Sequence, residues 1–337
     1  MLINQDFTRD RRNYLGGSDI GAILGLSKYR SALDVWLEKT GQSELTRTSL
    51  PLRFGSFAES FIAQEYTSAT GFELIHDERP ITHPQYDFLV GHVDRFVFES
   101  PLEKEKVLLE ESSQCAASHL LECKTANPFL QDDWGEPGSD QVPLPYLVQC
   151  IWYLMITGLK RCDLAVLFGN ADFRIYQIHQ DTELATMILD RAITFWEKHI
   201  KGNQAPPTQS EKDCLSLFNK GTALKSIEAV SSTYELSLHL QLLTERIETQ
   251  EKEVSSIRQH LMNEMQDAEL LTYQGKTMAT WKTPKQSYRL DSKRLEQDHP
   301  ELALQYQTPI QNSRRLVIKK LHRPSESLNI EHQMEQS

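Results

Sequence analysis

Three charged side chains in two short segments have the types and spacing that metal-assisted chemistry requires. Glu122 and Lys124 lie two residues apart in LLECKTA, and Asp94 lies in GHVDR. Successive side chains of a strand point to opposite faces, so Glu122 and Lys124 should share one face of the strand that LLECKTA predicts. If the two segments pair as an antiparallel hairpin, the carboxylates of Asp94 and Glu122 approach each other. Two carboxylates about 4 Å apart repel by roughly 4 kcal/mol at an effective dielectric of 20, and a divalent cation removes that repulsion.

The ligand types favour a hard divalent cation. A third carboxylate, Glu59, lies at the margin of an apolar helical stripe, and Cys123 should point to the opposite face of the strand from Glu122, so the expected ligands are carboxylate oxygens without a His or Cys companion. Oxygen ligands of this kind favour Mg²⁺, or Mn²⁺ in its place, over Zn²⁺. Such an ion activates water and polarises a phosphodiester, while Lys124 beside it would orient the attacking water or stabilise the transition state. Phosphodiester hydrolysis is therefore the reaction that the group suits best.

Each of these residues taken singly has an ordinary structural interpretation. An Asp after a strand commonly caps a turn, an ExK pair on a strand is commonly an exposed ion pair, and a Glu at a helix margin is commonly solvated. The order helix Glu, strand Asp, strand ExK and then a helix with Gln is what favours a catalytic interpretation.

Apolar periodicity and turn residues predict the elements that must position the site. Helical spacing predicts two short helices within GGSDIGAILGLSKYRSALDVWLEKTG and a helix from Ser56 to Gly71 that carries Glu59. β-branched and aromatic residues predict a strand or hairpin arm over 88–98 and, after a long polar connection, a second strand at LLECKTA. The next elements would be a buried helix at PYLVQCIWYLMITG, strands at CDLAVLFG and DFRIYQIH, and an amphipathic helix at LATMILDRAITFWEKHI.

The texture of the sequence changes after residue 205, where GNQAPPTQSEKD predicts a domain boundary. Beyond it, apolar residues follow alternating steps of four and three, interrupted by Gln250, as in a coiled-coil seam: Leu236, Leu240, Leu243, Ile247, Val254, Ile257, Leu261 and Met265. The seam fits equally a long helix packed on its own domain and one that mediates oligomerisation. LLTYQGKTMATWK predicts a hairpin with Gly275 in its turn, RRLVIKK a final strand, and 326–337 a disordered tail.

Composition and charge limit the classes of partner. The 337 residues carry a formal net charge of −11, which argues against a protein that coats nucleic acid indiscriminately. Residues 271–324, however, hold 11 Lys and Arg against 4 Asp and Glu, a local excess of 7 positive charges that can face DNA. The five cysteines include no CxxC pair, so disulfide, zinc and iron–sulfur sites are not expected. No run is apolar enough to cross a membrane, and no signal peptide is seen, so we expect a cytoplasmic protein without membrane contact.

The chain resembles the YqaJ-like viral recombinases, relatives of phage lambda exonuclease in the PD-(D/E)XK nuclease superfamily. The resemblance runs from about Arg11 to Trp196 and rests on RNYLGGSDIGAILGLSKYRSALDVWLEKTG, FGSFAES, VGHVDR, LLECKT and PYLVQCIWYLMITG. It implies an α/β restriction-endonuclease-like core over residues 1–205, with a mixed central sheet flanked by helices. Residues 206–325 would form an accessory module with a long helix or helical hairpin and short strands, without a counterpart in lambda exonuclease itself.

The resemblance also implies roles for individual residues. The metal ligands would be Glu59, Asp94, Glu122 and the backbone carbonyl of Cys123, and the catalytic residues would be these three carboxylates with Lys124 and Gln149. The N-terminal glycine turn would receive the 5'-phosphate of a DNA end, and the DNA contacts would be Arg11, Arg12, Ser18, Arg30 and Tyr146. Backbone donors before a helix suit an anion on physical grounds as well. A plain N-cap role for Ser18 and a surface role for Arg30 are the alternatives.

The activity that the resemblance implies is Mg²⁺-dependent hydrolysis of DNA from duplex ends, in the 5'-to-3' direction, during phage-type recombination by single-strand annealing. The implied partners are double-stranded DNA ends, a RecT-type annealing protein and further copies of the chain in an oligomer. The setting would be the bacterial cytoplasm, with a phage or mobile element as one source of the gene. Two other interpretations stay open, an endonuclease of the same fold and a catalytically idle DNA-binding scaffold for recombination. The 27 residues between Asp94 and Glu122 are more than a tight hairpin needs.

Overall fold

The strand segments with apolar and β-branched residues assemble into one five-stranded sheet. The computed structural model describes residues 10–43, 49–102, 104–105, 117–308 and 314–321. The sheet has the order β2-β5-β6-β7-β8, formed by Glu73–Ile75, Arg95–Phe98, His119–Ala126, Arg161–Phe168 and Asp172–His179. Strands β6 and β7 are parallel, and the other neighbouring pairs are antiparallel. Both central strands are buried over most of their length, as expected of strands covered on two faces.

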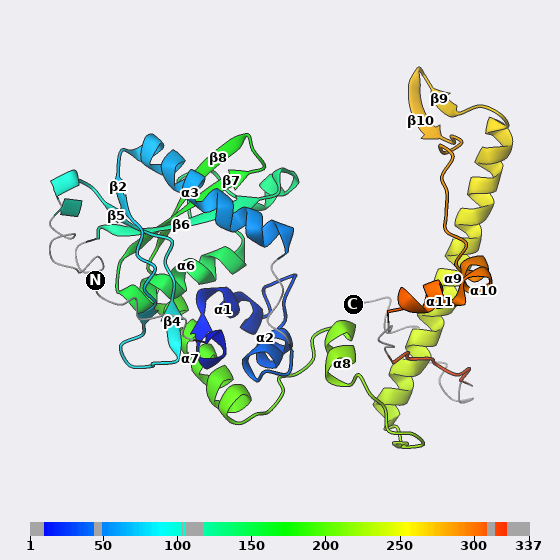
Figure 1. The fold of residues 1–337 in the computed structure, drawn as a ribbon, viewed down its shortest axis with the longest axis horizontal. Helices are drawn as coiled ribbons and strands as arrows, with labels where there is room; N and C mark the ends of the chain where they lie inside the picture. The colour runs from blue at the N-terminus through cyan, green and yellow to red at the C-terminus, as the bar shows by residue number, and fades with distance from the viewer. Residues whose placement is uncertain (1–9, 44–48, 103, 106–116, 309–313, 322–337) are drawn as a thin grey trace, which may run out of the picture. The chain divides into compact units, whose positions relative to one another are not determined.

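Helices cover both faces of this sheet (Figure 1). Helix α3 (Leu50–Thr70) places Tyr66 in an apolar cluster with Leu121 of β6. Helix α6 (Leu144–Thr157) packs on the opposite face, toward which Glu122 points. The predicted class, a restriction-endonuclease-like α/β core with a mixed central sheet flanked by helices, is confirmed.

Both flanking helices end at glycines, as the sequence predicts. Gly71 and Gly158 each have a φ of +75°, a left-handed conformation that side-chain-bearing residues rarely adopt. Helix α3 differs from the prediction at its other end, because it begins at Leu50 rather than at Ser56, with Pro51 in its first turn. Glu59 consequently lies near the middle of a longer helix.

A second sheet of three strands joins the N-terminal segment to the residues before Asp94. Strand β1 (Leu15–Gly16) pairs in parallel with β4 (Leu89–Gly91), which pairs antiparallel with β3 (Ile81–Thr82). The strand predicted over 88–98 is therefore two strands in different sheets, because the irregular residues 92–94 separate β4 from β5. The two short helices predicted near the N-terminus are α1 (Gly17–Ile23) and α2 (Ala32–Lys39), and two 3₁₀ turns are η1 (Arg11–Asn13) and η2 (Pro128–Asp133).

The chain divides into two compact units, residues 1–216 and 217–337, so the division lies later than the predicted boundary after residue 205. Helix α7 (Thr182–Phe195) and the π-helical turn Trp196–Lys201 precede α8 (Glu211–Leu217). The buried Asp213 of α8 accepts a hydrogen bond from Ser31 Oγ at 2.7 Å. This contact holds the segment after residue 205 on the first unit.

The second unit contains the long helix and the hairpin that the sequence predicts. These are α9 (Ser231–Met265) and the antiparallel strands β9 (Leu270–Tyr273) and β10 (Lys276–Thr280), followed by α10 (Ser292–Asp298) and α11 (Pro300–Gln305). The final strand predicted at RRLVIKK is wrong, because residues 314–320 form neither a strand nor a helix in the structure. The predicted tail, 326–337, and most of the polar connection before β6 lie outside the described residues.

Candidate active site on the central sheet

Glu122 is the centre of the candidate site, because its buried carboxylate contacts two of the other predicted residues. Pairing of β6 with β5 on one side and with β7 on the other holds Glu122 in the middle of the sheet, where it is 2% exposed. Its Oε1 accepts hydrogen bonds from Lys124 Nζ at 2.5 Å and from Gln149 Nε2 at 2.8 Å. Its buried Oε2 has no hydrogen-bond partner among the described residues.

Asp94 reaches the same part of β6 from the neighbouring strand. It directly precedes β5, and its Oδ2 accepts a hydrogen bond from the backbone N–H of Cys123 at 2.8 Å. The predicted antiparallel pairing of the two segments is present, with Arg95 opposite Leu121. The pairing therefore places the Asp94 carboxylate next to Cys123, between the candidate residues Glu122 and Lys124 of β6.

The charges of this cluster shift one another's titration. Burial and the Asp94 carboxylate raise the pKa of Glu122 to about 8, against the opposing effect of the Lys124 ammonium. Burial also raises the pKa of Asp94. Burial alone would lower the pKa of Lys124, but the carboxylates of Glu122 and Asp94 raise it above its ordinary value. Two carboxylates thus share one ammonium, and a proton on Glu122 or a cation beside it would balance the remaining charge.

Glu59 forms an ion pair with Arg95. Its Oε1 lies 2.6 Å from Arg95 Nη1, which also donates to the backbone carbonyl of Asp94 at 2.5 Å. Within the described residues, no group of three or more His, Cys, Asp and Glu side chains is arranged to hold a metal ion. In this conformation the charge of Glu59 is compensated by a guanidinium, and the sharing of one cation by the three carboxylates stays a prediction. Arg95 was missed by the sequence analysis, although it directly follows Asp94 in GHVDR.

The oxygen atoms around Glu122 nevertheless fit a hard cation. A buried carboxylate oxygen without a partner is costly unless a proton, a donor or a cation satisfies it, and Oε2 of Glu122 is in this position. The Asp94 carboxylate and the Cys123 carbonyl are oxygen ligands of the kind that Mg²⁺ takes. The Cys123 thiol does not compete as a ligand, since it lies in the apolar cluster under α3 and burial raises its pKa.

Helix α6 supplies Gln149 and a tyrosine that the sequence analysis missed. Gln149 Nε2 donates to Tyr153 Oη at 2.9 Å as well as to Glu122. Tyr153 is 5% exposed, and a Cβ atom on Gly17 would lie only 2.8 Å from its ring, so a glycine at position 17 is needed for this packing. The spacing of four residues after Gln149 was the available signal, because it places both side chains on one helix face.

Tyr146 lies on the same helix and is partly covered by an aromatic neighbour. Its ring stacks on Trp134 with the centroids 5.2 Å apart. Burial raises the pKa of Tyr146, and the Lys124 charge opposes that shift, which places its hydroxyl within the electrostatic range of the site. Trp134 is a second residue that the sequence analysis missed.

The predicted DNA-end residues separate into two groups. Arg11 Nη2 donates to Ser18 Oγ at 3.3 Å, and both side chains are exposed near the start of α1, as is Arg12. Arg30 instead pairs with Asp19 at 2.6 Å and with Glu38, and its Nε is buried without a partner among the described residues. Arg30 therefore has two carboxylate partners within the fold. The side chains of Arg11 and Ser18 instead present hydrogen-bond donors at the surface.

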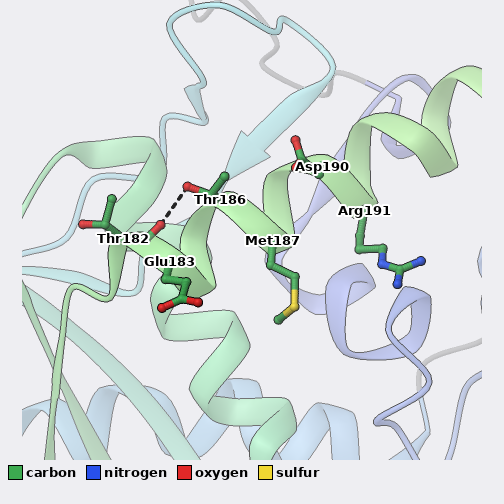
Figure 2. Close-up of a pocket in the computed structure, with 6 residues that line it drawn as sticks. All are labelled: Thr182, Glu183, Thr186, Met187, Asp190 and Arg191. Carbon is green, nitrogen blue, oxygen red and sulfur yellow. Dashed lines mark hydrogen bonds between the residues drawn. The ribbon is translucent and has the colours of Figure 1, made fainter.

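A surface hollow on α7 contains none of the predicted site residues. Figure 2 shows that it is lined by Thr182, Glu183, Thr186, Met187, Asp190 and Arg191, all from one helix. The polar interaction between them joins Thr186 Oγ1 to the backbone carbonyl of Thr182 at 2.8 Å, an ordinary contact within a helix. No catalytic arrangement is present there.

No helix among the described residues is both long and apolar enough to cross a lipid bilayer.

Comparisons with known proteins identify relatives over most of the chain. Residues 6–160 match the YqaJ-like viral recombinase domain. The protein YqaJ of Bacillus subtilis (strain 168) is 30% identical over 311 residues, which cover 89% of this chain and 91% of that protein. The relationship therefore includes the second unit as well as the candidate site.

Two solved structures of exonucleases are more distant. The alkaline exonuclease LHK-Exo from Laribacter hongkongensis has a TM-score of 0.45 and 16% identity, over 58% of this chain and 92% of that one. A phage-related exonuclease from Haemophilus somnus 129PT has a TM-score of 0.39 and 11% identity, over 57% of this chain and 96% of that one.

Proposed function

Since the chain belongs to the YqaJ-like viral recombinase family, we propose that it is a nuclease, and more narrowly a metal-dependent exonuclease that hydrolyses duplex DNA from its ends. The observation that supports this best is the carboxylate of Glu122. It is buried, its Oε2 has no hydrogen-bond partner among the described residues, and Lys124 and Asp94 lie beside it. A buried acidic group beside an ammonium is costly to maintain for stability alone, but it suits a reaction on a phosphodiester.

In this proposal Glu122, Asp94 and the backbone carbonyl of Cys123 hold the cation, which is Mg²⁺ with Mn²⁺ as a substitute. Glu59 would join them only after its ion pair with Arg95 at 2.6 Å opens. When bound, the cation supplies Lewis acidity and a water of lowered pKa.

The other residues act through position and charge. Lys124 keeps its proton near neutral pH because two carboxylates raise its pKa, so it can stabilise negative charge on a phosphoryl oxygen. Gln149 fixes the Glu122 carboxylate through Oε1, and Tyr153 fixes Gln149 in turn. Gln149 and Lys124 thereby occupy Oε1 of Glu122 and leave its Oε2 for another partner.

The finer parts of the proposal concern the DNA end and the partners. Digestion would run 5' to 3', in recombination by single-strand annealing with a RecT-type protein. The exposed side chains of Arg11, Arg12 and Ser18 would bind the 5'-phosphate. Tyr146 and Arg30 would contact the DNA nearby. Arg30 would do so while its guanidinium remains paired with Asp19 and Glu38.

The test is digestion of a linear duplex labelled separately at each end, with and without Mg²⁺. When Mg²⁺ is present we expect loss of the 5'-end label first and no attack on a closed circular duplex, and without a divalent cation we expect no digestion. Cutting of the circle would favour an endonuclease, and binding of linear DNA without digestion under any divalent cation would favour the idle scaffold.

Replacement of Arg11 and Ser18 by alanine should lower the preference for a 5'-phosphorylated end over a 5'-hydroxyl end by about tenfold. A hydrogen bond to a charged group contributes about 1.5 to 3 kcal/mol, and these side chains supply the exposed donors near the start of α1. Initial rates on the two kinds of end measure the ratio. Arg79→Ala is the matched control, because Arg79 is 55% exposed and pairs with Asp77. An unchanged ratio in the Arg11 and Ser18 variant would remove these residues from the end-binding site.

A further inference from the structure

Within the second unit, the apolar stripe of α9 from Leu236 to Leu261 is exposed among the described residues. Its members are between 41% and 69% exposed: Leu236, Leu240, Leu243, Ile247, Val254, Ile257 and Leu261. The stripe runs from Leu236 to Leu261 of the 35-residue helix, which at about 1.5 Å per residue is roughly 38 Å. An apolar stripe of this length on a surface, interrupted at one position by Gln250, marks an interaction site.

A hydrogen bond that α9 makes within its own unit uses another face of the helix. Gln241 Oε1 accepts a hydrogen bond from the backbone N–H of Leu321 at 2.9 Å. Gln241 follows the stripe residue Leu240 by one position, which points it away from the stripe. Of the two interpretations that the sequence left open, packing on the second unit is observed for Met265, which is 5% exposed, but not for the stripe from Leu236 to Leu261.

The spacing assigns each stripe residue to a coiled-coil position. Leu240, Ile247, Val254 and Leu261 occupy the first core position (a) of successive heptads, and Leu236, Leu243, Gln250 and Ile257 occupy the second (d). β-branched residues at a with Leu at d favour a coiled coil of two helices. The central layers have this pattern, with Ile247 and Val254 at a and Leu243 at d.

Gln250 distinguishes between the possible orientations and registers of two paired helices. In a parallel pair in register, Gln250 faces the same residue of the second helix, and the two amides can hydrogen-bond to each other. In an antiparallel pair, or after a shift by one heptad, its amide faces an apolar side chain and loses that partner. One polar core residue of this kind specifies register.

The charges beside the stripe fit the same arrangement. Arg246 and Glu253 occupy the position before a, and Glu251 and Arg258 occupy the position after d. Across a parallel pair in register, Arg246 of one helix meets Glu251 of the other, and Glu253 meets Arg258. None of the four has an opposite charge three or four residues away in its own sequence, so these charges are available to a second helix.

We propose that α9 forms a parallel, in-register, two-stranded coiled coil with α9 of a second copy of this chain. The identical polar residue at one core layer and the two kinds of complementary charge pair all require the same helix as the partner. The coiled coil would link two nuclease units, and it requires no property of the candidate active site.

The test is oxidative cross-linking of the full-length Gln250→Cys variant. We expect a disulfide-linked dimer for most of the chains, because in-register core positions bring the two sulfur atoms together. Glu248→Cys is the matched control on the outer face of the same helix, and it should cross-link no more than the wild type, whose own cysteines are equally present in both variants. Equal cross-linking at the two positions, or none at 250, would overturn the proposal and would leave the stripe to a different partner protein.

A charge exchange tests the pairing independently. Arg246→Glu should reduce the cross-linking of Gln250→Cys several-fold by placing Glu against Glu251 of the second helix, and adding Glu251→Arg should restore it. Failure of the second change to restore cross-linking would exclude the parallel register. Thermal unfolding of each variant checks that the helix and both units remain folded.

Discussion

Replacement of Lys124 by alanine is expected to lower the rate of duplex digestion by about 10²- to 10³-fold, the loss typical when one charge-stabilising donor is removed. Lys124 is the ammonium nearest to Glu122, at 2.5 Å from Oε1, and no second Lys or Arg donates to that carboxylate among the described residues. Glu122→Gln should cause a loss at least as large, since it removes the charge of the proposed cation ligand while keeping the side-chain shape. Single-turnover rates on linear duplex measure both effects.

A magnesium titration separates the two roles. Glu122→Gln should require more Mg²⁺ for its residual activity, whereas Lys124→Ala should keep the metal dependence of the wild type. Lys104→Ala is the matched control, because Lys104 forms an ion pair with Glu73 that is about one-third exposed. Undiminished digestion by both site variants would show that the chemistry occurs elsewhere on the chain.

Replacement of Asp19 by asparagine should reduce the free energy of unfolding by about 3 to 5 kcal/mol, the cost of leaving a buried charge without its partner. Asp19 is 1% exposed and Lys39, its partner at 2.8 Å, is 4% exposed. The same carboxylate accepts a hydrogen bond from the Gly16 backbone N–H at 3.0 Å at the start of α1. Denaturant unfolding measures the loss, and exposed Asp190→Asn on α7 should change stability by no more than about 0.5 kcal/mol.

The pH dependence of this stability has a defined sign. Burial alone raises the pKa of Asp19, but the charges of Lys39 and Arg30 outweigh it and lower the pKa below the ordinary value of 3.8. A carboxyl group with a lowered pKa in the folded state stabilises the fold above its ordinary pKa and loses that effect as the pH falls through the folded value. The difference in stability between wild type and Asp19→Asn should therefore be present at neutral pH and shrink below about pH 4. A difference that persists unchanged into strong acid would contradict the charge pairing.

Local sequence patterns were sufficient for most elements of the first unit. The ends of α3 and α6 follow from Gly71 and Gly158, because left-handed backbone at a helix end favours glycine. The orientation of Glu122 and Lys124 to one face of β6 follows from strand alternation. The long helix α9 and the hairpin at Gly275 also follow from the spacing of near neighbours.

Only the tertiary structure decided which distant side chains pair. The sequence does not show that Arg95 pairs with Glu59 or that Arg30 pairs with Asp19 and Glu38, and it left open whether the stripe of α9 packs within its own unit. Helix and strand formation depends on residues a few positions apart, whose spacing can be read along the chain. Ion pairing and burial depend instead on strand register, on helix orientation and on competition between several charges within reach, and these exist only once the chain has folded.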